Sequence, residues 1–112
     1  MNHLQNRQPE GLISVLLDRS AAHGDRDDAA MDLSQYPSAE TEEALVLIAS
    51  NSEEDLDLID SCAESLASIW AKNKLIDPTV FGHLVPYAQT FILDYLRKEN
   101  TSQFENFSED RD

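Results

Sequence analysis

The longest apolar pattern in the chain has the period of an α-helix. Between positions 56 and 70 an apolar side chain recurs every three to four residues, at Leu56, Ile59, Cys62, Ala63, Leu66, Ile69 and Trp70. A strand would instead alternate with a period of two. The chain also has only 3 Gly and 4 Pro among its 112 residues, which argues against a turn-rich all-β fold. The sequence therefore predicts an all-α fold.

Start and stop signals divide the rest of the chain into further helices. Gly24 is expected to stop a first helix and Asp25 to begin a second one, which ends at Pro37. We expect the later helices to begin at four signals: Ser38, Ser52 followed by three acids, Asp77-Pro78, and Pro86, which kinks or restarts the chain. The resulting prediction is about five to six helices.

Composition suggests how these helices are organised along the chain. Residues 1–9 are polar and expected to be flexible, residues 10–98 form the helical domain, and residues 99–112 are expected to be a disordered acidic tail. The stretch Ala44–Ala49 is apolar almost all round, so its helix is expected to be the most buried. No segment has the length of a membrane helix or the form of a secretory signal, and Cys62 is the only cysteine, so we expect a cytoplasmic protein.

The charge of the chain is strongly negative and unevenly distributed. It has 22 acidic and 8 basic residues, a formal net charge of −14, and no Lys or Arg between Arg26 and Lys72. Such a surface repels nucleic acid and anionic lipid and attracts a basic partner. An alternative stays open at this point, because an acidic surface also keeps a protein soluble without any partner.

No pattern in the sequence points to catalysis, a metal or a cofactor. The three histidines are far apart and none belongs to a His-Glu-x-x-His motif. Cys62 lies on the apolar face of its predicted helix, where a cysteine is usually a small core residue. The aspartates near positions 25 and 57 lack the glycine and the final glutamate of a calcium-binding loop. Trp70 ends an apolar stripe and is expected in the core rather than at a binding hot spot. We expect no enzyme and no cofactor.

Two of the predicted helices look alike, which suggests a repeat. The segment from Asp28 to Tyr36 matches the segment from Ser61 to Ile69, 33 residues further on (28 to 61), with small residues first and larger apolar ones later. The alternative is an ordinary helical bundle whose self-similarity is accidental. The residues Asp25, Arg26, Ala29, Ala30 and Leu33 resemble the start of the second helix of a HEAT repeat. This resemblance implies stacked antiparallel hairpins in a short superhelix.

The segments Arg26–Ser34 and Cys62–Trp70, together with the small size and acidity of the chain, resemble helical immunity proteins of bacterial contact-dependent growth inhibition and polymorphic toxin systems. The resemblance implies a monomer that binds a basic toxin domain, often a nuclease, in a 1:1 complex and covers its active site. The alternative is a non-inhibitory scaffold or adaptor for a basic protein partner. Charge and periodicity give the expected partner-binding residues, which should face outward on a concave surface: Asp28, Asp32, Gln35, Asp57, Asp60, Glu64, Ser65 and Ser68.

Overall fold

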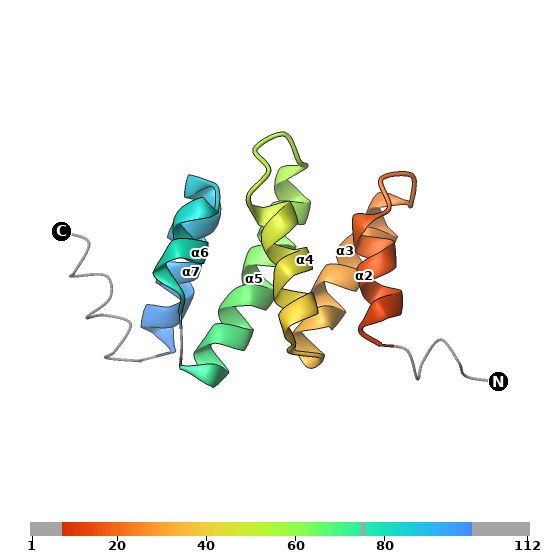
Figure 1. The fold of residues 1–112 in the computed structure, drawn as a ribbon. Helices are drawn as coiled ribbons and strands as arrows, with labels where there is room; N and C mark the ends of the chain where they lie inside the picture. The colour runs from red at the N-terminus through yellow and green to blue at the C-terminus, as the bar shows by residue number, and fades with distance from the viewer. Residues whose placement is uncertain (1–7, 75, 100–112) are drawn as a thin grey trace.

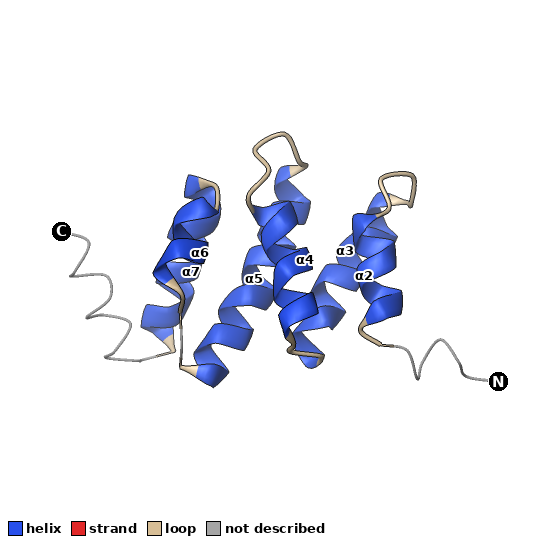
Figure 2. Cartoon of the chain, viewed as in Figure 1, coloured by secondary structure: helices blue, strands red, loops and turns tan. Residues whose placement is uncertain are grey.

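The described part of the chain, residues 8–74 and 76–99 of a computed structural model, consists of helices joined by short loops (Figures 1 and 2). No strand occurs within these ranges, so the predicted all-α class and the number of five to six helices are confirmed. The six α-helices and one 3-10 turn are α2 (Glu10–Leu17), α3 (His23–Asp32), η1 (Leu33–Gln35), α4 (Ala39–Ala49), α5 (Leu56–Asn73), α6 (Pro78–His83) and α7 (Pro86–Lys98). The predictions for residues 1–7 and 100–112 lie outside the described residues.

The helices form two layers, with successive helices alternating between them (Figure 1). We call α2, α4 and α6 the first-helix layer, and α3, α5 and α7 the second-helix layer. Within the second-helix layer, α5 packs against both α3 and α7, and it also packs against α4 of the other layer. The main-chain N–H of Val85 donates to the carbonyl of Ala49 (3.0 Å) and ties the start of α7 to the end of α4. The molecule is elongated as a result, measuring 49 × 28 × 21 Å.

The core lies between the two layers and is centred on α5. Ten residues of α5 are buried, from Leu58 to Trp70. The apolar positions matched by the internal repeat occupy equivalent places, since Ala29, Ala30 and Leu33 are buried like their counterparts in α5. Tyr36 breaks the correspondence with an exposed fraction of 41%, because α3 gives way to η1 before it.

Two of the predicted helix starts are confirmed in detail. The Ser38 hydroxyl accepts a hydrogen bond from the Thr41 N–H (3.1 Å) and caps α4. The Asp77 carboxylate accepts one from the Thr79 N–H (2.9 Å) at the start of α6, with Pro78 in the first helical position. Both side chains satisfy main-chain donors that have no partner inside the helix. Pro86 likewise begins α7, so it restarts the helix rather than kinking it.

The predicted boundary at Gly24 and Asp25 is wrong. Helix α3 begins at His23, so Gly24 and Asp25 both lie in its first turn and neither stops nor caps it. His23, Gly24 and Asp25 are all exposed, so water can satisfy the free N–H groups and no side-chain cap is required. An exposed first turn also tolerates a glycine better than a helix interior does.

The predicted start of the long helix at Ser52 is also wrong. Helix α5 begins at Leu56, and residues 51–54 form a turn in which the Asn51 side chain accepts from the Glu53 N–H (3.0 Å). A short local hydrogen bond of this kind gives the main chain an alternative to helix. Glu53 and Glu54 are therefore loop residues rather than first-turn acids.

Helix α4 is not the most buried helix, contrary to the prediction from its apolar sequence. Leu47 has an exposed fraction of 61%, whereas the core residues of α5 have fractions close to zero. A helix at the outer surface of a two-layer array can bury only one side, so a sequence that is apolar all round leaves apolar side chains uncovered.

Candidate protein-binding face

The acidic residues expected to bind a partner lie on the second-helix layer, in two stripes. On α3, Asp25, Asp28 and Asp32 are spaced by three and four residues and are exposed. On α5, the spacing of Asp57, Asp60 and Glu64 also places them on one helix face. Because α3 and α5 pack against each other, the two stripes belong to one layer of the molecule. We call this surface the acidic face.

The expected partner-binding residues differ in how far they reach solvent. Asp28, Asp32, Gln35 and Asp57 are exposed, while Asp60, Glu64 and Ser68 are partly buried. Ser65 is almost fully buried, with an exposed fraction of 2%. The prediction that Ser65 faces outward is therefore wrong. Ser61, one helical turn earlier and aligned by the repeat with Asp28, is also buried, at 9%.

The two serines are buried because they join α3 to α5. The Ser65 hydroxyl donates to the Ala30 carbonyl (2.6 Å), and the Ser61 hydroxyl donates to the Asp27 carboxylate. A small hydroxyl lets two helices approach closely and still satisfies a polar group at their contact. These bonds fix the position of α3 against α5 and hence of one acidic stripe against the other. The repeat aligned Ser61 and Ser65 with exposed aspartates, so it could not reveal this role.

The only cation in the sequence between Arg19 and Lys72 is directed into the protein. Arg26 has an exposed fraction of 8%, and its Nε donates to the Leu16 carbonyl (2.9 Å). Its Nη2 lies 3.5 Å from the Glu54 carboxylate, and the two side chains are only 10% and 8% exposed. Arg26 therefore joins α2, α3 and the loop before α5, and adds no exposed positive charge to the acidic face. The exposed His23 at the start of α3 pairs with Asp55 in the same region (3.3 Å).

Helix α7 borders the acidic face through Tyr87. The Tyr87 hydroxyl donates to the Asp60 carboxylate (3.1 Å), and 45% of the residue is exposed. This hydrogen bond, and then the charge of Asp60, raises the pKa of Tyr87. Sequence reasoning missed Tyr87, because no motif relates it to a residue 27 positions away. An exposed aromatic ring beside a carboxylate is a typical contact for a partner's arginine or lysine.

Trp70 and Cys62 belong to the core, as predicted. Trp70 is 3% exposed, and its indole Nε1 donates to the Glu42 carboxylate (3.0 Å) across the two layers. Cys62 is fully buried, and burial, followed by the charges of Asp27 and Glu54, raises the pKa of its thiol far above its usual value. A thiol in such a setting stays protonated and is a poor nucleophile.

Neither a metal-binding cluster nor a membrane-spanning helix occurs in the described part of the chain. Across residues 8–74 and 76–99, no group of three or more His, Cys, Asp or Glu side chains is arranged to hold a metal ion. In the same part of the chain, no helix combines the length and the apolar character needed to cross a membrane.

Comparison with known proteins adds no relative to this picture. A scan against protein-family models finds no match, and searches among curated proteins and among solved structures find none either. The resemblances to HEAT repeats and to immunity proteins therefore stay predictions.

Proposed function

We propose that this protein binds a basic protein partner through the acidic face of its second-helix layer. We further propose that it is an immunity protein, which neutralises a cognate bacterial toxin domain, a basic nuclease, by covering its active or substrate-binding site. The protein acts from the cytoplasm, as a monomer in a 1:1 complex. It needs no cofactor and performs no catalysis of its own.

One observation carries the proposal, namely that the carboxylates of the acidic face have no exposed lysine or arginine among them. Between positions 20 and 71 the sequence has one cation, Arg26, and its charge is used internally against Glu54. Neighbouring like charges of this kind produce a field that steers a basic partner into contact. A nuclease must offer a basic surface to the phosphates of its substrate, so the same surface is complementary to these carboxylates.

The packing of the two helices gives this surface a fixed geometry. The acidic side chains project from α3 and α5, which are held together by the buried hydrogen bonds of Ser61 and Ser65. Charges on rigid helices lose less entropy on binding than charges on loops. A solubilising surface requires no such fixed arrangement, which favours a binding role over simple solubility.

The first test is co-expression with the C-terminal domain encoded by the gene directly upstream. A cognate toxin and immunity protein should co-purify, and the cells should regain growth that the toxin domain alone abolishes. The integrity of RNA and DNA in unprotected cells then identifies the substrate of the toxin. Absence of both complex and rescue would contradict the proposal, and a complex without rescue would favour the non-inhibitory adaptor.

A second test concerns the face itself. Five isosteric substitutions remove its central charges while preserving side-chain size: Asp28→Asn, Asp32→Asn, Asp57→Asn, Asp60→Asn and Glu64→Gln. We expect association with the partner to slow by about tenfold or more and to lose most of its salt dependence, because steering depends on these charges. A control with isosteric substitutions at exposed acids outside the face, Glu53→Gln with Asp94→Asn, should leave the rate largely unchanged. Unaltered binding by the variant with all five substitutions would show that another surface contacts the partner.

A further inference from the structure

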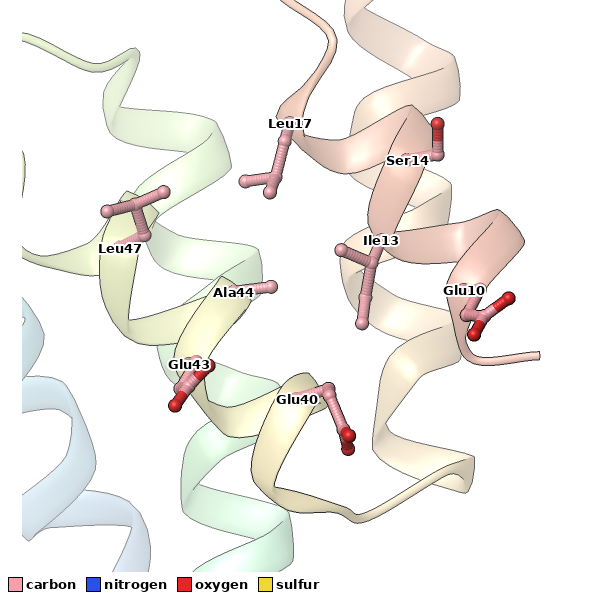
Figure 3. Close-up of a pocket in the computed structure, with 8 residues that line it drawn as sticks. All are labelled: Glu10, Ile13, Ser14, Leu17, Glu40, Glu43, Ala44 and Leu47. Carbon is pink, nitrogen blue, oxygen red and sulfur yellow. The ribbon is translucent and has the colours of Figure 1, made fainter. Parts of the chain in front are cut away.

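The first-helix layer has a groove between α2 and α4, whereas the acidic face belongs to helices of the other layer. The groove has a volume of about 530 Å³ and opens to solvent along its length. Ile13 and Leu17 of α2 and Ala44 of α4 point into the space between the two helices (Figure 3). The full set of lining residues comprises these three with Glu10, Ser14, Glu40, Glu43 and Leu47.

The apolar side chains at this groove remain partly uncovered. Leu47 is 61% exposed and Leu17 is 37% exposed, whereas the leucines of the core are fully buried. Leu47 and Glu43 also line a second groove on the other flank of α4, towards Val80 and His83 of α6. Helix α4 therefore forms a ridge with an apolar hollow on each side. Exposed apolar surface of this kind, bordered by polar groups, commonly marks a site of protein contact.

The charges at the groove between α2 and α4 are of one sign. Every titratable residue that lines it is a glutamate, and Glu40 and Glu43 are both exposed on α4. An occupant must therefore combine an apolar stripe with flanking positive charge. The acidic tail of this chain does not meet that requirement, because residues 100–112 contain four acids and one arginine.

We propose that the groove between α2 and α4 binds a basic amphipathic helix of a partner protein. Apolar side chains at positions i, i+3 or i+4, and i+7 of that helix would fill the space above Ile13, Ala44 and Leu47. Lysine or arginine side chains beside the apolar stripe would meet Glu40 and Glu43. Two helices with a hollow between them accept a third helix by the same ridge-into-groove packing that forms helical bundles.

This site is independent of the proposed function. The acidic face lies on α3 and α5, and the groove lies on α2 and α4 of the other layer. The two surfaces could therefore be occupied at the same time, and the protein could link a helix of one chain to the basic surface of another. Loss of either site by substitution should leave binding at the other unchanged.

The test is a titration of the full chain, isotopically labelled for NMR, with a synthetic helical probe. The probe is a peptide of about 14 residues, close to four helical turns, with leucines on one face and lysines beside them. We expect its shift changes to centre on the methyl groups of Ile13, Ala44 and Leu47. A second peptide, with glutamate in place of every lysine, should bind far more weakly because of repulsion by Glu40 and Glu43.

Matched variants distinguish specific binding of the probe in the groove from nonspecific hydrophobic binding elsewhere on the surface. Leu47→Ser should weaken binding of the basic probe by about tenfold or more, the expected effect of losing one buried leucine. Leu56→Ser is the control, because Leu56 is 55% exposed but lies on α5, away from the groove. A double variant, Glu40→Gln with Glu43→Gln, should reduce both the affinity and its salt dependence.

Three results would overturn the proposal. The first is the absence of shift changes at millimolar probe, or changes centred on the acidic face instead. The second is equal binding of the acidic and basic peptides. The third is a doubled mass in light scattering for the unmodified chain that Leu47→Ser abolishes, since a second copy would then be the occupant. None of these results bears on toxin neutralisation, which is measured by growth rescue.

Discussion

Arg26 should be the most sensitive polar residue of the fold, and Arg26→Met tests why. The substitution keeps an unbranched side chain that fills the same space and removes only the guanidinium group. In the structure this group donates to the Leu16 carbonyl at 2.9 Å and lies 3.5 Å from the Glu54 carboxylate. Methionine offers neither contact, so an acceptor and a nearly buried negative charge both lose their partner.

The size of the effect follows from these two losses. Breaking a buried ion pair by removing one partner costs about 3–5 kcal/mol of unfolding free energy. The lower end applies here, because 3.5 Å is a long separation for a charge-assisted hydrogen bond. We therefore expect Arg26→Met to destabilise the protein by about 3 kcal/mol, which corresponds to a fall of about 12–24 °C in melting temperature for a domain of this size.

The assay is urea denaturation followed by circular dichroism, with Arg19→Met as the control because Arg19 is exposed. Adding Glu54→Gln to Arg26→Met should recover part of the loss, because it removes the unpaired charge. A loss below about 1 kcal/mol for Arg26→Met, similar to that of the control, would refute the structural role of the pair. Strict additivity of the two substitutions would show that the side chains do not interact.

Three further predictions concern the contacts of α5 with its neighbouring helices and its buried thiol. Ser65→Ala should destabilise the protein by about 1–2 kcal/mol through the loss of its buried hydrogen bond, whereas Ser68→Ala should change stability by less than about 0.5 kcal/mol; denaturation of both variants checks this. Trp70→Phe should cost about 1–2 kcal/mol because the Glu42 carboxylate loses its donor, whereas Glu42→Gln keeps an acceptor and should cost less in the same assay. Cys62 should resist thiol reagents in the folded state, because burial raises the pKa of its thiol. In the unfolded chain the thiol loses its proton above about pH 8.5, so the free energy of unfolding should fall as the pH rises beyond that value. Cys62→Ala should remove this part of the pH dependence of stability.

Hydrophobic periodicity was sufficient to predict the helical class and most of the helices. The apolar stripe of α5 from Ile59 to Trp70 lies in the core, whereas its first predicted member, Leu56, is exposed. The caps at Ser38 and Asp77 are where the sequence indicated. The errors arose where one local signal competes with another, or where exposure to water makes a cap unnecessary. A turn at Asn51 delays the start of α5, and the exposed first turn of α3 has no need of a cap.

The candidate site was less accessible to sequence reasoning than the fold. Charge and spacing placed Asp28, Asp32 and Asp57 at the surface, but the same spacing wrongly placed Ser65 there. A helix pattern does not distinguish a polar side chain facing water from one that satisfies a neighbouring helix. Leu47 presents the opposite case, an apolar side chain expected in the core that forms the most exposed part of a groove.

The most direct test of the central claim is the association rate with the toxin domain at low and high salt for two variants of equal charge. One variant removes three charges from the acidic face, and the other removes three from outside it. The acidic-face substitutions are Asp28→Asn, Asp57→Asn and Glu64→Gln, and the control substitutions are Glu53→Gln, Asp94→Asn and Glu99→Gln, at exposed residues outside both the acidic face and the groove. The account predicts that only the first variant associates more slowly at low salt and protects cells less well. Equal slowing by both variants would contradict it, because net charge rather than the acidic face would then govern recognition.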